Sequence, residues 1–253
     1  MITAITVVRD FNSYDRYLKN NPNCNDWVFY AYDNNAENRA IPERYNSFLD
    51  QYDYGKDSWF VFCHEDFEPL ENLTKRIRQL DLERSAIYSS IGCKRVGVAG
   101  FGMQRCYGRM KIGSKRDAKV IGAVGMAVDG KKEVETFDCC CLIVHSSLVR
   151  RYNMRFDANL YFDFYVEDFC ATAKLRHKVR SYVIPFSACH HSDSVTVRFK
   201  QHLPYLKQKY PNDYFVGTCT YFGTFSWQKR LQDRILRFIR ESRALKLLFA
   251  KKR

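Results

Sequence analysis

The fold is decided by the stretch Asp57-Ser58-Trp59-Phe60-Val61-Phe62-Cys63-His64-Glu65-Asp66. Its apolar run is typical of a buried strand, and it ends in two acids with no Lys or Arg beside them. Open α/β sheets place ligands at the carboxyl ends of their strands. Carboxylates at that edge suit Mg²⁺ or Mn²⁺, which often reach a protein through one or two carboxylates and substrate phosphates. Taken alone, the tripeptide His64-Glu65-Asp66 is equally consistent with an acid that only caps the next helix.

The flanking sequence alternates between strand-like and helix-like patterns. The expected strands cover residues 2–8, 27–32, 58–63, 96–100, 137–144 and 180–184, and the expected helices cover 13–19, 41–51, 71–80, 164–178 and 203–210. Glycines and little apolar periodicity over 100–130 predict long loops there. The alternation predicts an α/β fold with a Rossmann-like, mostly parallel central sheet flanked by helices.

The composition indicates a globular protein. The chain has 253 residues, of which 46% are hydrophobic and 15% aromatic, and this excludes a disordered chain. No apolar stretch reaches membrane-spanning length. The ten cysteines include no Cys-x-x-Cys pair. We therefore expect reduced thiols and a cytoplasmic location.

The positive charge is concentrated at the C-terminus. Residues 228–253 hold ten Lys/Arg against two Asp/Glu, which is more than half of the net charge of +13. An apolar stripe at three- and four-residue steps predicts an amphipathic helix over 227–250, formed by Leu231, Ile235, Phe238, Ile239, Leu245, Leu248 and Phe249. This helix either binds an anionic membrane, as a peripheral anchor on its inner face, or packs on the catalytic domain or a second subunit.

Several short motifs occur in order over about residues 1–200. After the strand at 2–8 come Tyr32-Asp33-Asn34, Tyr45-Asn46, Phe62-Cys63-His64-Glu65-Asp66, Gly97-Val98-Ala99-Gly100, Phe137-Asp138, Phe156-Asp157, Tyr165-Val166-Glu167-Asp168-Phe169-Cys170 and His190-His191-Ser192. This ordered set resembles the GT-A glycosyltransferases of the family 2-like group. The resemblance implies a metal-dependent, inverting transfer of a sugar from a nucleotide-diphosphate donor to a hydroxyl of a glycan or lipid-linked acceptor.

The resemblance also implies a division of the chain. A GT-A catalytic domain would cover residues 1–200, with a nucleotide-sugar half of about 1–105 and an acceptor half of about 106–200. Residues 201–253 would form a basic, amphipathic helical tail. The sugar, the nucleotide base and the oligomeric state stay open.

The donor and metal residues follow from the same resemblance. Asp66 matches the last acid of the family's Asp-x-Asp motif and is expected to bind Mn²⁺ or Mg²⁺. His64 replaces the first acid, which leaves the ribose or metal contact of that position open, and Glu65 is the middle member with no specific role. The other expected donor-side residues are Val8, Asp33 and Arg198, although Asp33 also suits a plain Asx turn.

A third metal or diphosphate ligand is expected from His190 or His191. Adjacent side chains on an extended chain point in opposite directions, so only one of the two is expected to act. We favour His190.

The catalytic base is expected at the start of the helix over 164–178. An inverting transfer needs one base to take the proton of the acceptor hydroxyl. Asp168 matches the position of that base and Glu167 is the second choice. Both acids also simply suit the first turn of a helix. Asp138 and Asp163 are expected to contact the acceptor, or else to be structural acids.

Two other classes compete with this interpretation. A nucleotidyltransferase acting on sugar phosphates would share the sheet and the metal, but it opens with a Gly-rich phosphate loop, and residues 8–13 contain no glycine. A nucleic-acid-binding protein is suggested by the pI of about 9.3. Because the excess charge is concentrated in one tail, we expect no nucleic-acid partner.

Overall fold

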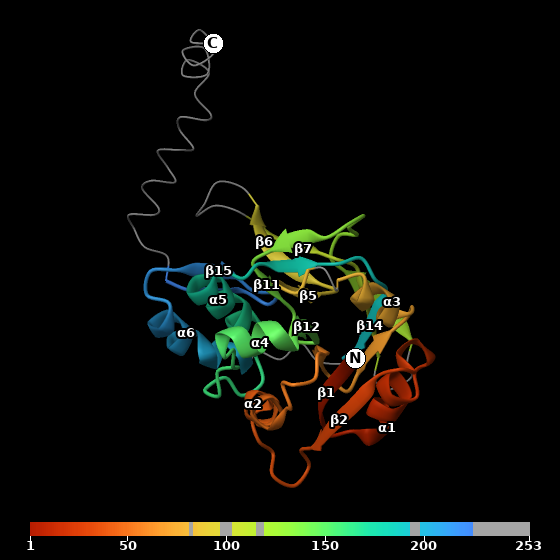
Figure 1. The fold of residues 1–253 in the computed structure, drawn as a ribbon. Coiled ribbons are helices and arrows are strands. Elements are labelled where there is room, and N and C mark those ends of the chain that lie inside the picture. Colours follow the sequence, from red (N-terminus) through yellow and green to blue (C-terminus); the bar gives the residue numbers. More distant parts are fainter. Residues whose placement is uncertain (81–82, 97–102, 115–118, 193–197, 225–253) are drawn as a thin grey trace.

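The structure is a computed structural model that describes residues 1–80, 83–96, 103–114, 119–192 and 198–224 (Figure 1). The strands are β1 (Ile2–Val8), β2 (Val28–Asp33), β3 (Trp59–Cys63), β4 (Phe67–Pro69), β5 (Ile87–Ser89), β6 (Gly92–Val96), β7 (Met103–Tyr107), β8 (Met110–Gly113), β9 (Val120–Val124), β10 (Lys132–Val134), β11 (Thr136–Phe137), β12 (Cys141–His145), β13 (Ser181–Val183), β14 (Ala188–His191), β15 (Tyr214–Val216) and β16 (Tyr221–Gly223). The helices are α1 (Phe11–Tyr14), which continues as the π-helical segment Asp15–Lys19, and α2 (Ile41–Gln51), α3 (Leu73–Arg78), α4 (Ser146–Tyr152), α5 (Tyr165–His177) and α6 (Leu203–Lys209).

A seven-stranded sheet forms the centre of the molecule, in the order β10-β13-β5-β12-β3-β1-β2. β1, β2, β3, β5 and β13 run in one direction, whereas β10 and β12 run in the other. The predicted α/β fold with a mostly parallel central sheet and flanking helices is therefore confirmed.

Both faces of the sheet are buried at β1 and β3, which explains why these two strands are almost continuously apolar. Alternate residues of β1 and β3 enter opposite cores. Ile5 and Phe62 pack with α2 and α5 in one core, and Ala4 and Val61 pack with α1 and α3 in the other. The apolar run that ends at His64 is thus a central strand of the sheet.

Two predictions about the middle of the chain were wrong. The described part of residues 100–130 contains β7, β8 and β9 instead of long loops. The expected strand over 137–144 is divided into β11 and β12, because Asp138 Oδ1 accepts a hydrogen bond from the Cys140 amide and turns the chain. Of the expected strand over 96–100, residues 97–100 lie outside the described residues.

Residues 203–223 pack on the core beside α5. Leu206 and Tyr210 of α6 and Phe215 and Phe222 of the β15–β16 hairpin are buried in the same core as α2 and α5. The expected helix over 227–250 lies outside the described residues, and the division of the chain at residue 200 stays a prediction. In the part of the chain that is described, no helix combines the length and the apolar character needed to cross a membrane.

Candidate active site

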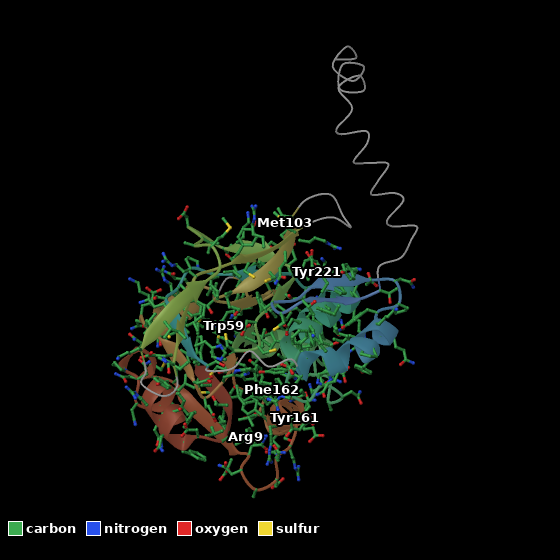
Figure 2. The ribbon with its side chains drawn as sticks, turned by 180° about the vertical axis from the view of Figure 1, so that it is seen from behind. Arg9, Trp59, Met103, Tyr161, Phe162 and Tyr221 are labelled. Atoms are coloured by element: carbon green, nitrogen blue, oxygen red, sulfur yellow. The ribbon has the colours of Figure 1, made fainter. Side chains whose placement is uncertain are left out.

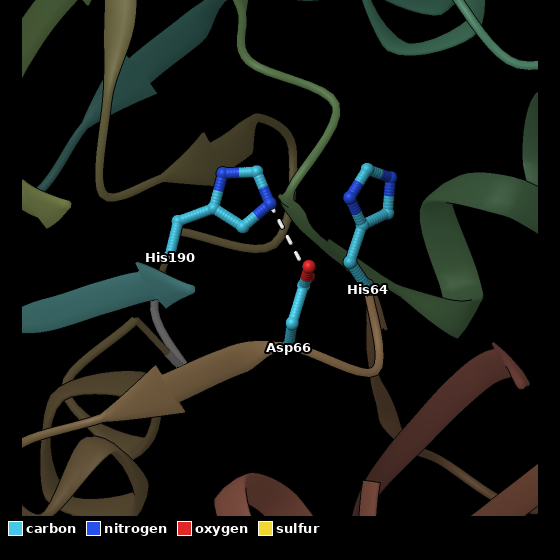
Figure 3. A group of neighbouring side chains, drawn as sticks. All are labelled: His64, Asp66 and His190. Carbon is cyan, nitrogen blue, oxygen red and sulfur yellow. Dashed lines mark ion pairs between the residues drawn. The ribbon is translucent and has the colours of Figure 1, made fainter. Parts of the chain in front are cut away.

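Three side chains that could hold a metal ion meet at the carboxyl end of β3. His64, Asp66 and His190 each offer one ligand atom, and these atoms lie within 4.8 Å of one another. Asp66 is buried, and its Oδ1 lies 3.2 Å from Nε2 of His190. Figure 3 shows one ring nitrogen of His64 facing His190 while the other points away.

Strand pairing explains how His190 reaches Asp66 across more than a hundred residues. The chain turns after His64 and enters β4, which pairs antiparallel with β14 and places His190 opposite Phe67. The amide of His191 donates to the Asp66 carbonyl oxygen at 2.9 Å. The pairing of two short strands therefore joins the two parts of the cluster.

A hydrogen-bond chain sets the tautomer of His64. The Tyr165 hydroxyl donates its one proton to the Cys139 carbonyl oxygen at 2.9 Å, and it lies 2.8 Å from Nε2 of His64. The hydroxyl must therefore accept a proton from Nε2, which leaves the lone pair of His64 on Nδ1. A neutral imidazole held in this way by a second residue is the usual arrangement of a metal-binding histidine.

His191, the other candidate histidine, faces away from this cluster. Its ring stacks on Tyr17, with centroids 4.0 Å apart, and its Nε2 lies 2.7 Å from Oε2 of Glu68. The geometry thus brings His190, and not His191, to Asp66. The alternation of side chains along β14 is the reason.

A cleft lies beside the cluster at the carboxyl ends of β1, β2 and β3. Its volume of about 80 Å³ is below the roughly 300 Å³ of common ligand pockets, so a nucleotide requires it to widen. Arg9 Nη2 donates to the Tyr161 hydroxyl at 3.2 Å beside it, and Figure 2 shows these residues next to Phe162. The lining comprises Val7, Arg9, Asn34, Arg39, Ile41, His64, Glu65, Asp66, Tyr161 and Phe162.

The residues expected on the donor side are not all brought to this cleft. Val8 is wholly buried in the core, and its neighbour Val7 lines the cleft instead. Asp33 is exposed and accepts a hydrogen bond from the Asn35 amide at 2.9 Å, which is an Asx turn. Asn34 is the residue of this turn that lines the cleft.

Glu65 and Arg198 lie at the cleft through different contacts. Glu65 Oε2 accepts hydrogen bonds from the Arg9 and Asp10 amides at 2.6 and 3.0 Å, so it also holds the loop after β1. The Arg198 guanidinium lies 5.4 Å from the ring centroid of Phe162, which lines the cleft. Sequence reasoning missed Arg9, although its place directly after the first strand was a usable signal.

The two acids at the start of α5 are both buried but have different partners. The Glu167 carboxylate accepts from the Thr218 hydroxyl at 3.2 Å and the Cys139 thiol at 3.0 Å. Burial raises the pKa of Glu167 to about 7, and Asp138 contributes to the rise. Asp168 is instead bound by Tyr210, at 2.6 Å, and by Lys209, at 2.7 Å.

The two acids expected on the acceptor side lie in different surroundings. Asp138 belongs to a second possible ligand group with Cys140 and His190. Burial alone would raise the pKa of Asp138, but His190 and the Cys140 amide lower it overall. Asp163 is half-buried, and burial raises its pKa despite His202 and Arg198. Of the two, only Asp138 is thus brought to the histidine cluster.

Comparisons with known proteins give only distant likenesses. No family profile and no curated protein sequence matches the chain. A197 from STIV is 15% identical, with a TM-score of 0.41 over 76% of this chain and 87% of its own. S. aureus TarS 1-349 is 12% identical, with a TM-score of 0.44 over 96% and 73%, and its complex with UDP-GlcNAc is 13% identical, with 0.44 over 96% and 74%. TM-scores below 0.5 carry no argument about function, which has to rest on the site itself.

Proposed function

We propose that the chain is a metal-dependent, inverting glycosyltransferase that uses a nucleotide-diphosphate sugar. The observation that carries the proposal is the joining of His64, Asp66 and His190 at strand ends, directly beside the cleft. The Asp-x-Asp-like motif, which resembles that of the GT-A glycosyltransferases, contributes two of the three residues. A glycan or lipid-linked hydroxyl is the proposed acceptor.

The donor set fits a transition-metal ion such as Mn²⁺ better than Mg²⁺. Two of the three candidate ligands are imidazoles, whereas Mg²⁺ prefers oxygen ligands alone. His64 Nδ1, the Asp66 carboxylate and His190 Nε2 would hold the ion. When bound, the ion would offset the charge that develops on the departing diphosphate.

The cleft residues would bind the rest of the donor. Arg9 and Arg39 line the cleft, and their positive charges can face a diphosphate. Tyr161 and Phe162 provide aromatic faces on which a nucleotide base or sugar can pack. Arg9, Tyr161 and Asn38 are hydrogen-bonded to one another, so donor entry would separate these contacts.

Glu167 is the proposed catalytic base, in place of Asp168. A base that acts near neutral pH needs a pKa close to 7, and burial gives Glu167 that value. Asp138 acts electrostatically on Glu167 and shares a possible ligand group with His190, so it is near both the base and the metal cluster. Glu167 would take the proton of the acceptor hydroxyl as the oxygen attacks the sugar. Thr218 and Cys139 would have to release the carboxylate for this step.

The loop after β1 argues against the alternative function, a nucleotidyltransferase. Such a loop would bind phosphate through free backbone N–H groups. Here the amides of Arg9 and Asp10 donate to Glu65, and those of Asn12 and Ser13 donate to Asp10. Carboxylates therefore already occupy the positions where phosphate oxygens would bind.

Ligand-induced stabilisation tests the proposal. Melting temperatures would be measured with UDP-, GDP-, dTDP- and CMP-sugars, with and without Mn²⁺, since a ligand that binds the native state stabilises it. We expect one nucleotide class to raise the Tm in the presence of Mn²⁺, and the Asp66→Asn variant to lose this effect. Asp50→Asn is the matched control, because Asp50 is an exposed acid paired with Arg155. No shift with any donor, or an equal shift in Asp66→Asn, would reject the proposal.

A further inference from the structure

A second group of ligand-type side chains lies on the other face of β14. Glu68, Cys189 and His191 each offer one ligand atom, and these atoms lie within 4.8 Å of one another. Cys189 and His191 are two residues apart on β14 and point to the same face, whereas His190 points to the opposite one. Glu68 lies directly opposite Cys189 in the pairing of β4 with β14.

The imidazole of His191 is prepared for a further partner. Its Nε2 lies 2.7 Å from the Glu68 carboxylate, so Nε2 carries the proton and Nδ1 keeps its lone pair. Nδ1 is buried and has no hydrogen-bond partner among the described residues. Buried polar atoms are nearly always paired, so this lone pair indicates a ligand.

The surroundings hold this imidazole and the thiol in place. Tyr17 stacks on the His191 ring with an interplanar angle of 9°. β8 lies alongside β14, and a Cβ on Gly113 would lie 2.2 Å from His191 Nδ1 and 3.0 Å from Cys189 Sγ. A glycine is therefore required for β8 to approach the two ligand atoms this closely. The Glu68 side chain keeps 29% of its surface exposed, which provides a path from solvent.

We propose that Cys189 Sγ and His191 Nδ1 are ligands of a second metal ion, Zn²⁺ or a similar thiophilic ion, and that the Glu68 carboxylate holds the imidazole through Nε2–H. Sulfur and imidazole nitrogen are the ligands that Zn²⁺ prefers, and a carboxylate on the other ring nitrogen orients such a histidine. On binding, the Cys189 S–H bond breaks, its proton passes to solvent, and the thiolate and the Nδ1 lone pair form bonds to the metal. The site would fasten β4 to β14 and so fix the strand that carries His190. It does not depend on the sugar-transfer reaction.

Cobalt substitution of the full chain tests this site. A thiolate bound to Co²⁺ gives charge-transfer absorption, and the cluster of His64, Asp66 and His190 contains no sulfur. We expect the wild-type protein to show this absorption with Co²⁺ and to lose it when Zn²⁺ is added. Absence of the absorption from the wild-type protein would overturn the proposal, whatever the variants do.

Two cysteine variants locate the sulfur. Cys140 is a competing thiol ligand, because it shares a possible group with His190. We expect the absorption to vanish in Cys189→Ser and to persist in Cys140→Ser. The reverse pattern would place the ion at the other cluster and overturn the proposal.

Glu68→Gln provides a variant at a partly exposed position if Cys189→Ser does not fold. Loss of a carboxylate that supports a metal-bound histidine weakens metal binding by about 10–100-fold. We expect the Kd for Zn²⁺, measured with a competing chelator, to rise by that factor while the circular dichroism spectrum is unchanged. An unchanged Kd in a folded Glu68→Gln protein would contradict the site.

Discussion

Lys209 Nζ lies 2.7 Å from Asp168 Oδ1, and this contact distinguishes Asp168 from the adjacent carboxylate of Glu167 on α5. Asp168 is bound by the cation and by the Tyr210 hydroxyl, so it joins α5 to α6. Glu167 carries no cation contact, and its pKa is raised to about 7. Burial also raises the pKa of Asp168, although Lys209 and Tyr210 oppose the rise. The two acids therefore differ in their cation contact, which Asp168 has and Glu167 lacks within the described part of the chain.

Replacing Glu167 with Gln should therefore remove the base. The substitution keeps the shape of the side chain but not its ability to accept a proton, so kcat should fall by roughly 10²–10⁴. Donor binding, measured by calorimetry, should stay the same. Asp168→Asn is the comparison. The kcat of its folded fraction should stay within about tenfold of the wild-type value. A larger loss in Asp168→Asn than in Glu167→Gln would return the role to Asp168.

The activity should rise with pH through about 7. Glu167 must be deprotonated to act, and its pKa is about 7, so kcat/KM should increase as the pH passes that value and then level off. The Thr218 hydroxyl donates to this carboxylate and lowers the pKa. Thr218→Val should therefore move the rise to higher pH, while Thr220→Val, in the same hairpin, should not. A rise at the same pH in both variants would show that Glu167 does not control the profile.

Tyr165 should affect metal binding without contacting the metal. Its hydroxyl accepts the Nε2 proton of His64, and loss of such a contact typically weakens metal affinity by about 10–100-fold. Tyr165→Phe should raise the Kd for Mn²⁺ by that factor in calorimetric titrations. Tyr88→Phe is the matched control, since the buried Tyr88 hydroxyl donates to the Glu83 carbonyl oxygen instead. Equal affinities in the two variants would exclude this role.

Lys209 should be important for stability. Lys209 forms ion pairs with Asp168 and Asp157, and these contacts raise its pKa overall although burial would lower it. Removing one member of a buried ion pair costs about 3–5 kcal/mol, because the other charge stays buried. Lys209→Met should therefore lower the free energy of unfolding in urea by about 3 kcal/mol. Lys207→Met, at an exposed position of the same helix, should change it by less than about 0.5 kcal/mol.

The C-terminal segment should confer membrane binding. Its basic residues flank an apolar stripe, and each adds about 1 kcal/mol of attraction near an anionic surface. The full chain should sediment with anionic vesicles and not with neutral ones, whereas a chain ending at Ser226 should stay in solution. Equal binding of the truncated chain would show that this segment is not the anchor.

Five of the seven strands of the central sheet could be predicted from the sequence because their causes are local, whereas the short strands β5 and β10 were not predicted. The apolar run before His64 is long enough for one strand and ends in turn-forming residues, and the predicted bounds of β1 and α2 agree with the structure. The predicted loops over residues 100–130 were wrong, since β7, β8 and β9 are short strands and β9 is exposed throughout. Such strands depend on pairing with distant segments and leave little periodicity in the sequence.

The sequence by itself determined the α/β fold and the acid at the end of the central strand. Hydrophobic periodicity and turn-forming residues act between near neighbours in the chain, so both can be recognised locally. Only the tertiary structure decided which histidine faces Asp66, because that depends on the pairing of β4 with β14. It also gave Glu167 and Asp168 different partners. The first turn of a helix favours an acid at either position, but Lys209, forty-one residues beyond Asp168, binds only one of them. A side chain's charge partner is a property of long-range packing.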